Sequence, residues 1–388
     1  MSSVKQISTK GSDVQKFFNA SNDLLKDVKT VFVFNDINNK MNAFLVTNDD
    51  KTYTFGGNFF GVLGLGHKNP IDKLVLNKKL SQISLCDFRY SYQHCVGRTA
   101  DGKVYSWGYN KFGVFGDNRR NDSLHKPKLN KYLKHEFVVD ISTGFWHTLA
   151  LTCEGRVYQF GDNTLCQMAS GIDSKSISLK PKLLDAFDGE RVVSISSGAF
   201  HSLALTESGH VYSWGSNDCG QLGIGKVPAI RKPTPVIVMG LKVAKISTGF
   251  DHNLLLSREG YIYTFGCNEC GELGQTTKTT EQYLPIRLNH SERFVDIESD
   301  NSYPFSAALS ESGDYYVWGM SRQHDIHELN TKPKHCKAYE SFIELFLEEH
   351  RITQRAVHNF NGNKNLHKRL SVQLSHQINI SADNVITK

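Results

Sequence analysis

One short pattern recurs six times along the chain, and this repetition limits the possible folds more than any other feature. The pattern is an aromatic residue followed by glycine and a glycine-rich tail, as in YSWGSNDCGQLGIG at 212–225. The aromatic residues are evenly spaced along the sequence, at Phe55, Trp107, Phe160, Trp214, Phe265 and Trp318. A regular period of about 50 residues predicts six copies of one supersecondary unit that stack on one another.

A second element precedes the first, as in ISSGAFHSLALTESG at 195–209. It places a histidine, and then a glycine, at fixed offsets ahead of the aromatic residue. These residues include His94, His147, His201, His252, Gly155, Gly209 and Gly260. Because their offsets are constant, we interpret them, with Trp107, Trp214 and Trp318, as structural repeat positions. The histidine is expected to bond backbone near a turn, and the glycine to supply positive φ.

The residues between the histidine and the aromatic position predict a β-hairpin. A short apolar stretch follows the histidine, and T-x-x-G or S-x-x-G then supplies a turn. The next run, such as VYSWG at 211–215, places tyrosine and tryptophan on one face of a strand. A lone hairpin is marginally stable in water, so the units must stack. Strand-rich repeats of about 50 residues indicate propeller blades rather than a helical solenoid.

Residues 195–223 resemble the repeat of the regulator-of-chromosome-condensation family, G-x-x-H-S-x-A-L-T-x-x-G-x-V-Y-x-W-G-x-N-x-x-G-Q-L-G. The resemblance extends over about residues 25–325 and is specific, since many positions match in several copies. The family fold is a β-propeller with seven blades. The resemblance therefore implies an all-β chain in which six blades carry visible signatures. A seventh blade is expected from a degenerate or shared segment near the termini.

The repeat pattern ends after Trp318, and a short helical tail is expected at 331–388. Apolar residues there recur with the spacing of an amphipathic helix, at Tyr339, Phe342, Ile343, Phe346 and Leu347. The tail resembles remnants of the BTB region of condensation-repeat-and-BTB proteins. A whole BTB domain needs about a hundred residues, so its body would be missing. The expected division is an N-terminal segment at 1–24, a propeller at 25–330 and the tail.

Composition excludes several classes of protein. The chain has 388 residues, of which 39% are hydrophobic and 22% charged, as expected for a globular protein. Its 45 Lys and Arg against 39 Asp and Glu give a net charge of +6, so no phosphate-rich partner is required. No apolar run is long enough for a membrane-spanning helix, so no membrane association is expected. The eight scattered cysteines and the absence of an apolar leader favour a cytoplasmic or nuclear location.

Four short motifs have the spacing of a metal or phosphate site: Cys267-x-x-Cys270, His324-x-x-His327, His335-Cys336 and the glycines Gly61, Gly64 and Gly66. The histidine motifs are isolated, and the glycines belong to the G-x-L-G of the repeat without a phosphate-loop lysine. In another unit, the two slots of the cysteine motif hold Ser216 and Cys219, so these are variable loop positions. We therefore predict no catalytic residue, no metal and no cofactor.

Basic residues gather in the loops between the units, and the strongest candidates for partner binding are Arg119, Arg120, Lys126, Lys128, Arg231 and Lys232. Propeller symmetry would place equivalent loops on a common face. This arrangement gives the hypothesis of a basic rim for an acidic peptide, a chromatin surface or a nucleic acid. The alternative is an ordinary solvated surface, because charge runs usually are solvated.

The resemblance implies a non-catalytic protein-interaction module. In the BTB subfamily this would be the substrate-recognition part of a cullin-type ubiquitin-ligase adaptor. The alternative is guanine-nucleotide exchange on a Ran-like small GTPase, although the even spacing leaves no blade with a distinctive insertion. Light sensing is set aside, since only GFWHT at 144–148 approaches the G-W-R-H-T of the plant ultraviolet receptor. The expected partners are therefore proteins, either cullin-type ligase components or a small GTPase.

Overall fold

Twenty-four strands form six four-stranded antiparallel sheets in the part of the chain that the structure describes. This computed structural model describes residues 24, 27–35, 40–91, 93–120, 123–169, 177–184, 186–236, 241–275, 279–299, 301, 304–319 and 327–328. The all-β fold expected from the repeats is confirmed. The expected helical tail lies outside the described residues, as does nearly all of the N-terminal segment. Within the described ranges, no helix has the length and apolar character to cross a bilayer.

Each sheet takes four strands that follow one another in the sequence. Sheet 1 contains β1 (Val28–Asn35), β2 (Met41–Thr47), β3 (Thr52–Gly56) and β4 (Ile71–Leu76); sheet 2 contains β5 (Leu85–Ser91), β6 (His94–Thr99), β7 (Val104–Tyr109) and β8 (Ser123–Leu129). Sheet 3 contains β9 (Val138–Thr143), β10 (His147–Thr152), β11 (Val157–Gly161) and β12 (Ser178–Leu184). Two short helices, η1 (Phe59–Gly61) and α3 (Lys78–Ile83), flank β4.

The second half repeats this arrangement. Sheet 4 contains β13 (Val192–Ser197), β14 (His201–Thr206), β15 (Val211–Gly215) and β16 (Ile230–Pro235). Sheet 5 contains β17 (Val243–Thr248), β18 (His252–Ser257), β19 (Ile262–Cys267) and β20 (Glu281–Arg287). Sheet 6 contains β21 (Phe294–Ser299), β22 (Phe305–Ser310), β23 (Tyr315–Gly319) and β24 (His327–Glu328).

The predicted hairpin joins the second and third strands of every sheet. In sheet 4 it joins β14 to β15, and Gly209 in its turn has φ of 88°. Asp50 takes the same place in sheet 1 with φ of 63°, a left-handed conformation that aspartate tolerates better than most residues. Strand β14 is buried along its whole length because neighbouring sheets cover both of its faces, whereas the outer strand β12 has buried residues only at its two ends.

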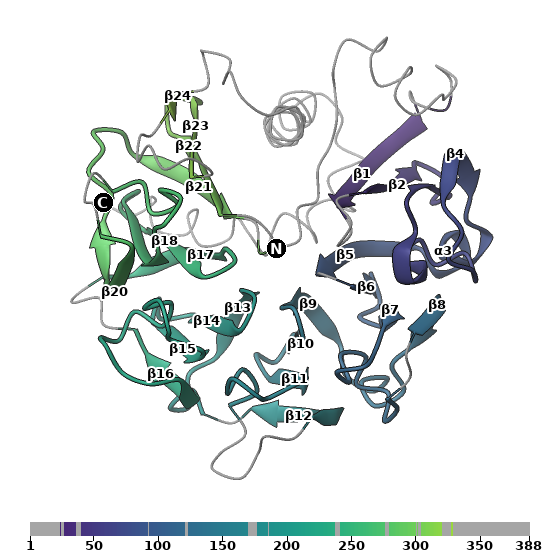
Figure 1. Cartoon of the computed structure of the whole chain (residues 1–388), viewed down its shortest axis with the longest axis horizontal. Helices are drawn as coiled ribbons and strands as arrows, with labels where there is room; N and C mark the ends of the chain where they lie inside the picture. The colour runs from purple at the N-terminus through teal and green to yellow at the C-terminus, as the bar shows by residue number, and fades with distance from the viewer. Residues whose placement is uncertain are drawn as a thin grey trace, which may run out of the picture. The chain divides into compact units, whose positions relative to one another are not determined.

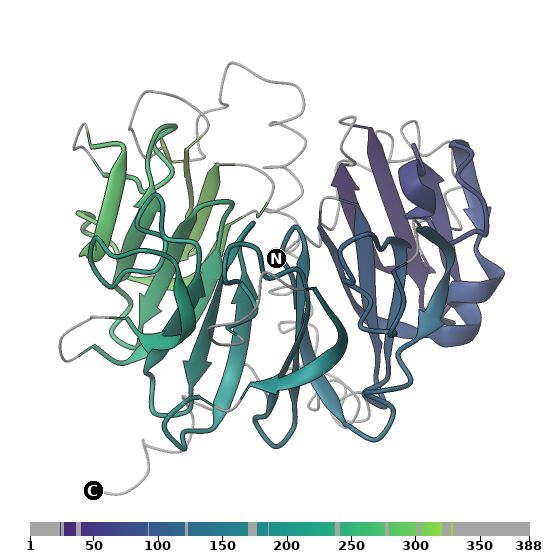
Figure 2. The same cartoon turned by 60° about the horizontal axis from the view of Figure 1, so that its bottom comes forward.

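The six sheets follow one another around a common centre in chain order, with the first strand of each sheet innermost and the fourth outermost (Figure 1). Successive strands run in opposite directions between two faces of this unit, as the side view in Figure 2 shows. The turn between strands one and two and the loop between strands three and four therefore lie on one face. We name this the loop face. The opposite face carries the hairpin turns and the connections between sheets.

The four repeat histidines are buried and join neighbouring sheets. Each Nε2 atom meets the side chain that follows the histidine position in the next sheet. The pairs are His94–Thr148 at 3.5 Å, His147–Ser202 at 2.8 Å, His201–Asn253 at 2.8 Å and His252–Ser306 at 2.9 Å. A Cβ atom at Gly198 would lie 2.1 Å from the ring of His201, so the glycine ahead of the histidine makes room for it.

The histidines contact the following sheet, whereas the tryptophans form hydrogen bonds to the preceding sheet. Each indole Nε1 donates to a backbone carbonyl in the loop of the preceding sheet: Trp107 to Val62 at 2.7 Å, Trp214 to Gln167 at 3.1 Å and Trp318 to Glu272 at 2.9 Å. All three side chains are buried in the hydrophobic clusters between sheets. Phe160 and Phe265 fill the same slot elsewhere and contribute packing alone.

A buried asparagine organises the loop after the third strand. Asn217 accepts a hydrogen bond from the Leu222 amide at 3.0 Å and donates to the carbonyls of Gly225 and Val227 at 3.1 and 2.7 Å. Asn58, Asn110, Asn163 and Asn268 accept the equivalent amide bond in other sheets. The loop also reaches the outer strand of the next sheet, because the Gly225 amide donates to the Tyr283 carbonyl at 2.9 Å.

The buried histidines predict that acid destabilises the fold. Burial lowers the pKa of His94, His147 and His252 to about 3 and that of His201 to about 4. Below pH 6.5 the unfolded chain binds protons that the folded chain refuses, so stability present above pH 6.5 is lost as the pH falls. Each histidine then lowers the free energy of unfolding by about 1.4 kcal/mol per pH unit. Asp140 and Asp251, whose pKa values burial raises to about 6, partly offset this loss.

Urea unfolding between pH 7 and pH 5 measures this dependence. His252→Gln should reduce the change in the free energy of unfolding with pH by the contribution of one histidine. His67→Gln, at an exposed position, should leave this change as it is in the wild type. If His252→Gln lost stability between pH 7 and pH 5 as steeply as the wild type, His252 would not be a source of the pH dependence.

The hydrogen bonds of the loop asparagine Asn217 give a second stability prediction. Asn217→Ala removes three hydrogen bonds from a buried loop and should lower the free energy of unfolding by about 2–4 kcal/mol in urea denaturation. Asn217→Asp keeps the acceptor for Leu222 and loses the two donated bonds, so it should be destabilised as well. Asn48→Ala is the control, because Asn48 is exposed. A loss below about 0.5 kcal/mol in the free energy of unfolding of Asn217→Ala would contradict this role for Asn217.

Candidate interaction face

A row of aromatic side chains runs across the loop face from sheet 1 to sheet 5. We name it the aromatic row. Its ring centroids lie 4.4 Å apart for Phe59–Phe60, 4.5 Å for Phe60–Tyr109, 6.5 Å for Tyr109–Phe112, 4.5 Å for Phe112–Trp146, 5.0 Å for Trp146–Phe200, 5.6 Å for Phe145–Phe200 and 5.1 Å for Phe145–Phe250. Most contacts are edge-to-face or tilted, the arrangements that aromatic pairs favour.

Two positions of the repeat supply half of this row. Phe60 and Phe112 stand two residues after the loop asparagine, whereas Trp146 and Phe200 stand immediately before the repeat histidine. The turns that carry the second group are joined by backbone bonds across sheets: the Phe145 amide donates to Ala199 at 3.0 Å, and the Ala199 amide to Phe250 at 2.9 Å. The backbone beneath the row is therefore fixed.

The side chains of the aromatic row keep part of their surface in water. Phe59 is 38% exposed, and the others are half-buried. Large aromatic side chains that are held rigidly and keep an open edge are the residues that protein interfaces use as anchors. A continuous row of them gives this face an apolar strip that a partner protein could cover.

The predicted basic rim is partly neutralised. Arg119 and Lys128 both pair with Asp117, at 2.8 and 3.2 Å, and the side chain of Asp117 is only 5% exposed. The Arg120 Nε donates to the Lys111 carbonyl at 3.0 Å, and the Lys126 side chain packs over Gly66. Arg119 and Lys128 therefore stabilise their own loop, which leaves Arg120 and Lys126 as the better candidates for an external partner.

Two further residues of the predicted rim, Arg231 and Lys232, lie in β16, and their side chains are outside the described part of the structure.

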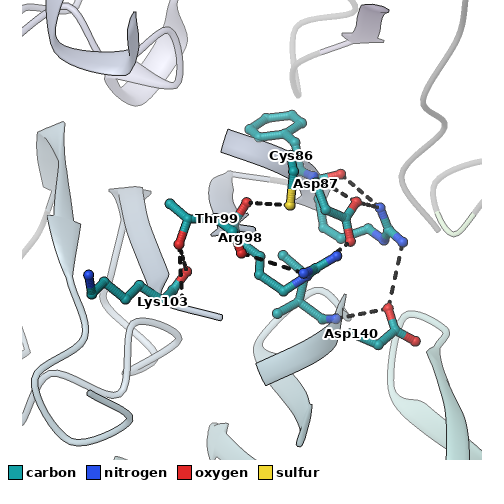
Figure 3. Close-up of polar contacts among 9 residues, drawn as sticks. Cys86, Asp87, Arg98, Thr99, Lys103 and Asp140 are labelled. Carbon is teal, nitrogen blue, oxygen red and sulfur yellow. Dashed lines mark hydrogen bonds and ion pairs between the residues drawn. The ribbon is translucent and has the colours of Figure 1, made fainter. Parts of the chain in front are cut away.

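A polar cluster lies on the inner strands of sheets 2 and 3, where Figure 3 shows its contacts. The Arg89 guanidinium pairs with Asp87 on its own strand and reaches Asp140 of sheet 3 at 3.7 Å, and Arg98 lies 3.9 Å from Asp87. The Cys86 thiol donates to the Arg98 carbonyl at 3.4 Å. Burial raises the pKa of Asp140 to about 6. Because these opposite charges pair across two sheets, the cluster is a structural connection.

The residues that the sequence marks as structural repeat positions lie apart from the loop face surface. The repeat histidines and tryptophans are buried between sheets, and Gly155, Gly209 and Gly260 take positive φ in hairpin turns on the opposite face. In the ranges that the structure covers, no three His, Cys, Asp or Glu side chains come close enough to hold a metal ion. Sequence reasoning missed the aromatic row, although comparing the repeat slot of Phe60 with that of Phe112 would have indicated it.

Comparison with known proteins agrees with this architecture. The sequence matches the RCC1-like domain family over residues 38–342. It is 32% identical over 265 residues to the human E3 ubiquitin-protein ligase HERC2, which covers 67% of this chain and 5% of the ligase. It is 31% identical over 231 residues to the Arabidopsis thaliana ultraviolet-B receptor UVR8, with 59% and 52% covered. The chain thus spans only part of the length of these relatives.

Solved structures give the same fold. Prp20p of Saccharomyces cerevisiae superimposes with a TM-score of 0.65 at 20% identity, covering 81% of this chain and 80% of Prp20p. Because identity is this low, the likeness concerns the fold alone. The propeller expected from the repeats is confirmed, and the chain belongs to the RCC1-like domain family.

Proposed function

We propose that this chain is a non-catalytic protein-interaction propeller that holds a partner protein on its loop face. The aromatic row supports this proposal above all, since it is a partly exposed apolar strip on a rigid backbone. Arg120 and Lys126 would add charge at the rim of the interface, where complementarity serves specificity and association rate. The proposed location is the cytosol or the nucleus.

The partner that we favour is a protein substrate delivered to a ubiquitin ligase. Similarity to HERC2 supports this assignment, because the matching region makes up only 5% of that ligase and is thus one module of it. HERC3, named as a probable E3 ubiquitin-protein ligase, matches at 33% identity over 161 residues, which is 15% of its length. The alternative is exchange of guanine nucleotide on a small GTPase. Prp20p, whose structure was described together with binding to Gsp1p and histones, shares only the fold.

A double substitution in the aromatic row should abolish partner capture. In affinity purification of the full chain from cell extract, Phe112→Ser with Phe200→Ser should lose the partners that the wild type retains, at least about tenfold, since the strip is broken at its centre. The matched control is Phe137→Ser with Val295→Ser. These two side chains are 47% and 52% exposed at the starts of β9 and β21, on the opposite face.

Ubiquitin-ligase components or their substrates among the captured proteins would support the adaptor assignment. A small GTPase bound preferentially without nucleotide would replace it with exchange. Equal loss in both double variants would contradict the loop face as the binding surface.

Charge reversal of Arg120 and Lys126 should weaken capture mainly at low salt, because exposed charges are screened as salt rises.

A further inference from the structure

Two cysteines from neighbouring sheets meet on the loop face. Cys219 lies in the loop between β15 and β16 of sheet 4, and Cys267 is the last residue of β19 in sheet 5. Each thiol shifts the pKa of the other through a side-chain interaction, and both side chains are half-buried. They belong to successive copies of the repeat and are distant in the sequence. The contact is therefore a tertiary one between sheets, and neither thiol is shut away from small molecules in solution.

The repeat explains why these two positions come together. Cys219 stands two residues after the loop asparagine Asn217, and Cys267 stands at the end of the third strand. Phe60 and Tyr109 hold the same two slots in sheets 1 and 2, where their rings lie 4.5 Å apart. The thiol pair thus replaces an aromatic pair at an equivalent contact between sheets.

Backbone and side-chain bonds hold the two loops in register. The Tyr283 hydroxyl donates to the Asp218 carbonyl at 3.1 Å, and Tyr283 lies on β20, whose first residue pairs with Cys267. The Cys267 amide donates to the Asp251 carbonyl at 2.8 Å, while the Gln221 side chain donates to the Asp251 carboxylate at 3.1 Å. Asp251 therefore contacts both loops that carry the thiols, so their approach does not depend on a transient movement.

The same contact divides the roles of the two sulfur atoms. The interaction with Cys267 lowers the pKa of the Cys219 thiol, and the same interaction raises the pKa of Cys267. Burial and the carboxylates of Asp251, Glu281 and Asp218 act in the opposite direction on Cys219, but the effect of the Cys267 thiol outweighs them. Cys219 is therefore the sulfur that more readily becomes a thiolate, the nucleophilic form.

We propose that Cys219 and Cys267 form a redox-modification site at which a hydroperoxide drives formation of a disulfide between sheets 4 and 5. The Cys219 thiolate attacks the peroxide, the O–O bond breaks, and sulfur is oxidised to sulfenic acid while the peroxide is reduced to water or an alcohol. The Cys267 sulfur then attacks the sulfenic sulfur. The S–O bond breaks, the disulfide forms, and the hydroxide leaves as water with the Cys267 proton.

Cys270 could compete with Cys219 for a disulfide to Cys267, because it is close to Cys267 in the sequence. Its position in the repeat, however, faces a different sheet. It stands two residues after Asn268, the position that in sheets 1 and 4 faces the following sheet. The position of Cys267, at the end of the third strand, faces the preceding sheet. The structure thus favours the Cys219–Cys267 bond over a bond within Cys267-x-x-Cys270.

Mapping of disulfides in the full chain tests this site. The chain is treated with hydrogen peroxide, free thiols are alkylated, and the protein is digested with an endoproteinase that cleaves after glutamate. Cleavage after Glu269 separates Cys267 from Cys270, so mass spectrometry distinguishes the two pairings. We expect a peptide pair that joins Cys219 to Cys267 and disappears on reduction. Cys166, in the equivalent loop of sheet 3, should remain alkylated as a free thiol.

Three variants make the result decisive. Cys270→Ser should keep the cross-link, whereas Cys219→Ser and Cys267→Ser should lose it. The oxidised wild type should also melt at a temperature at least about 3 °C above that of the reduced protein, a shift absent in Cys267→Ser. A Cys267–Cys270 disulfide, or sulfinic acid at Cys219 with Cys267 still alkylated, would overturn the proposal. Partner capture is not part of this test, so its outcome is independent of the proposed function.

Discussion

The rest of this structure depends on one interaction, the hydrogen bond between each repeat histidine and the side chain that follows the histidine position in the next sheet. Ser306 receives the His252 ring at 2.9 Å and donates to the Glu272 carbonyl at 2.7 Å, so one hydroxyl contacts both the strand and the loop of the preceding sheet. Asn253 does the same with His201 and the Gln221 carbonyl. Buried polar groups are costly unless every one is bonded. These bonds fix the spacing between successive sheets from sheet 2 to sheet 6 and hence the placement of the loops between them.

A fixed spacing has a consequence for function. The bonded positions of the repeat, which are the histidine, the residue after it and the loop asparagine, cannot vary without loss of bonds between sheets. The positions between them face water at the loop face and are free to differ. In this chain they hold phenylalanine, tyrosine and tryptophan in sheets 1 to 5, and cysteine in sheets 4 and 5. Binding chemistry is thus placed on a scaffold whose own bonds do not involve it.

The sequence predicted the fold well because its repeats make the structural signal redundant. The spacing of the aromatic residues, the glycine turns and the strand periodicity all indicated stacked hairpins, and the six sheets agree with them. The face that a partner would use was harder to predict. Phe112 and Trp146 come from different copies of the repeat and stack only because two sheets meet, which no local pattern encodes. The basic residues had a clear sequence signal, but Asp117, which neutralises Arg119 and Lys128, had none.

The central claim is that partners bind the aromatic row on the loop face. Hydrogen–deuterium exchange of the full chain, alone and with a captured partner, tests this claim most directly. The account predicts slower exchange on binding in peptides that contain Phe112, Trp146 and Phe200, with no change in the hairpin turns at Gly155 and Gly209. Protection confined to those hairpin turns, with the loop face unchanged, would contradict it.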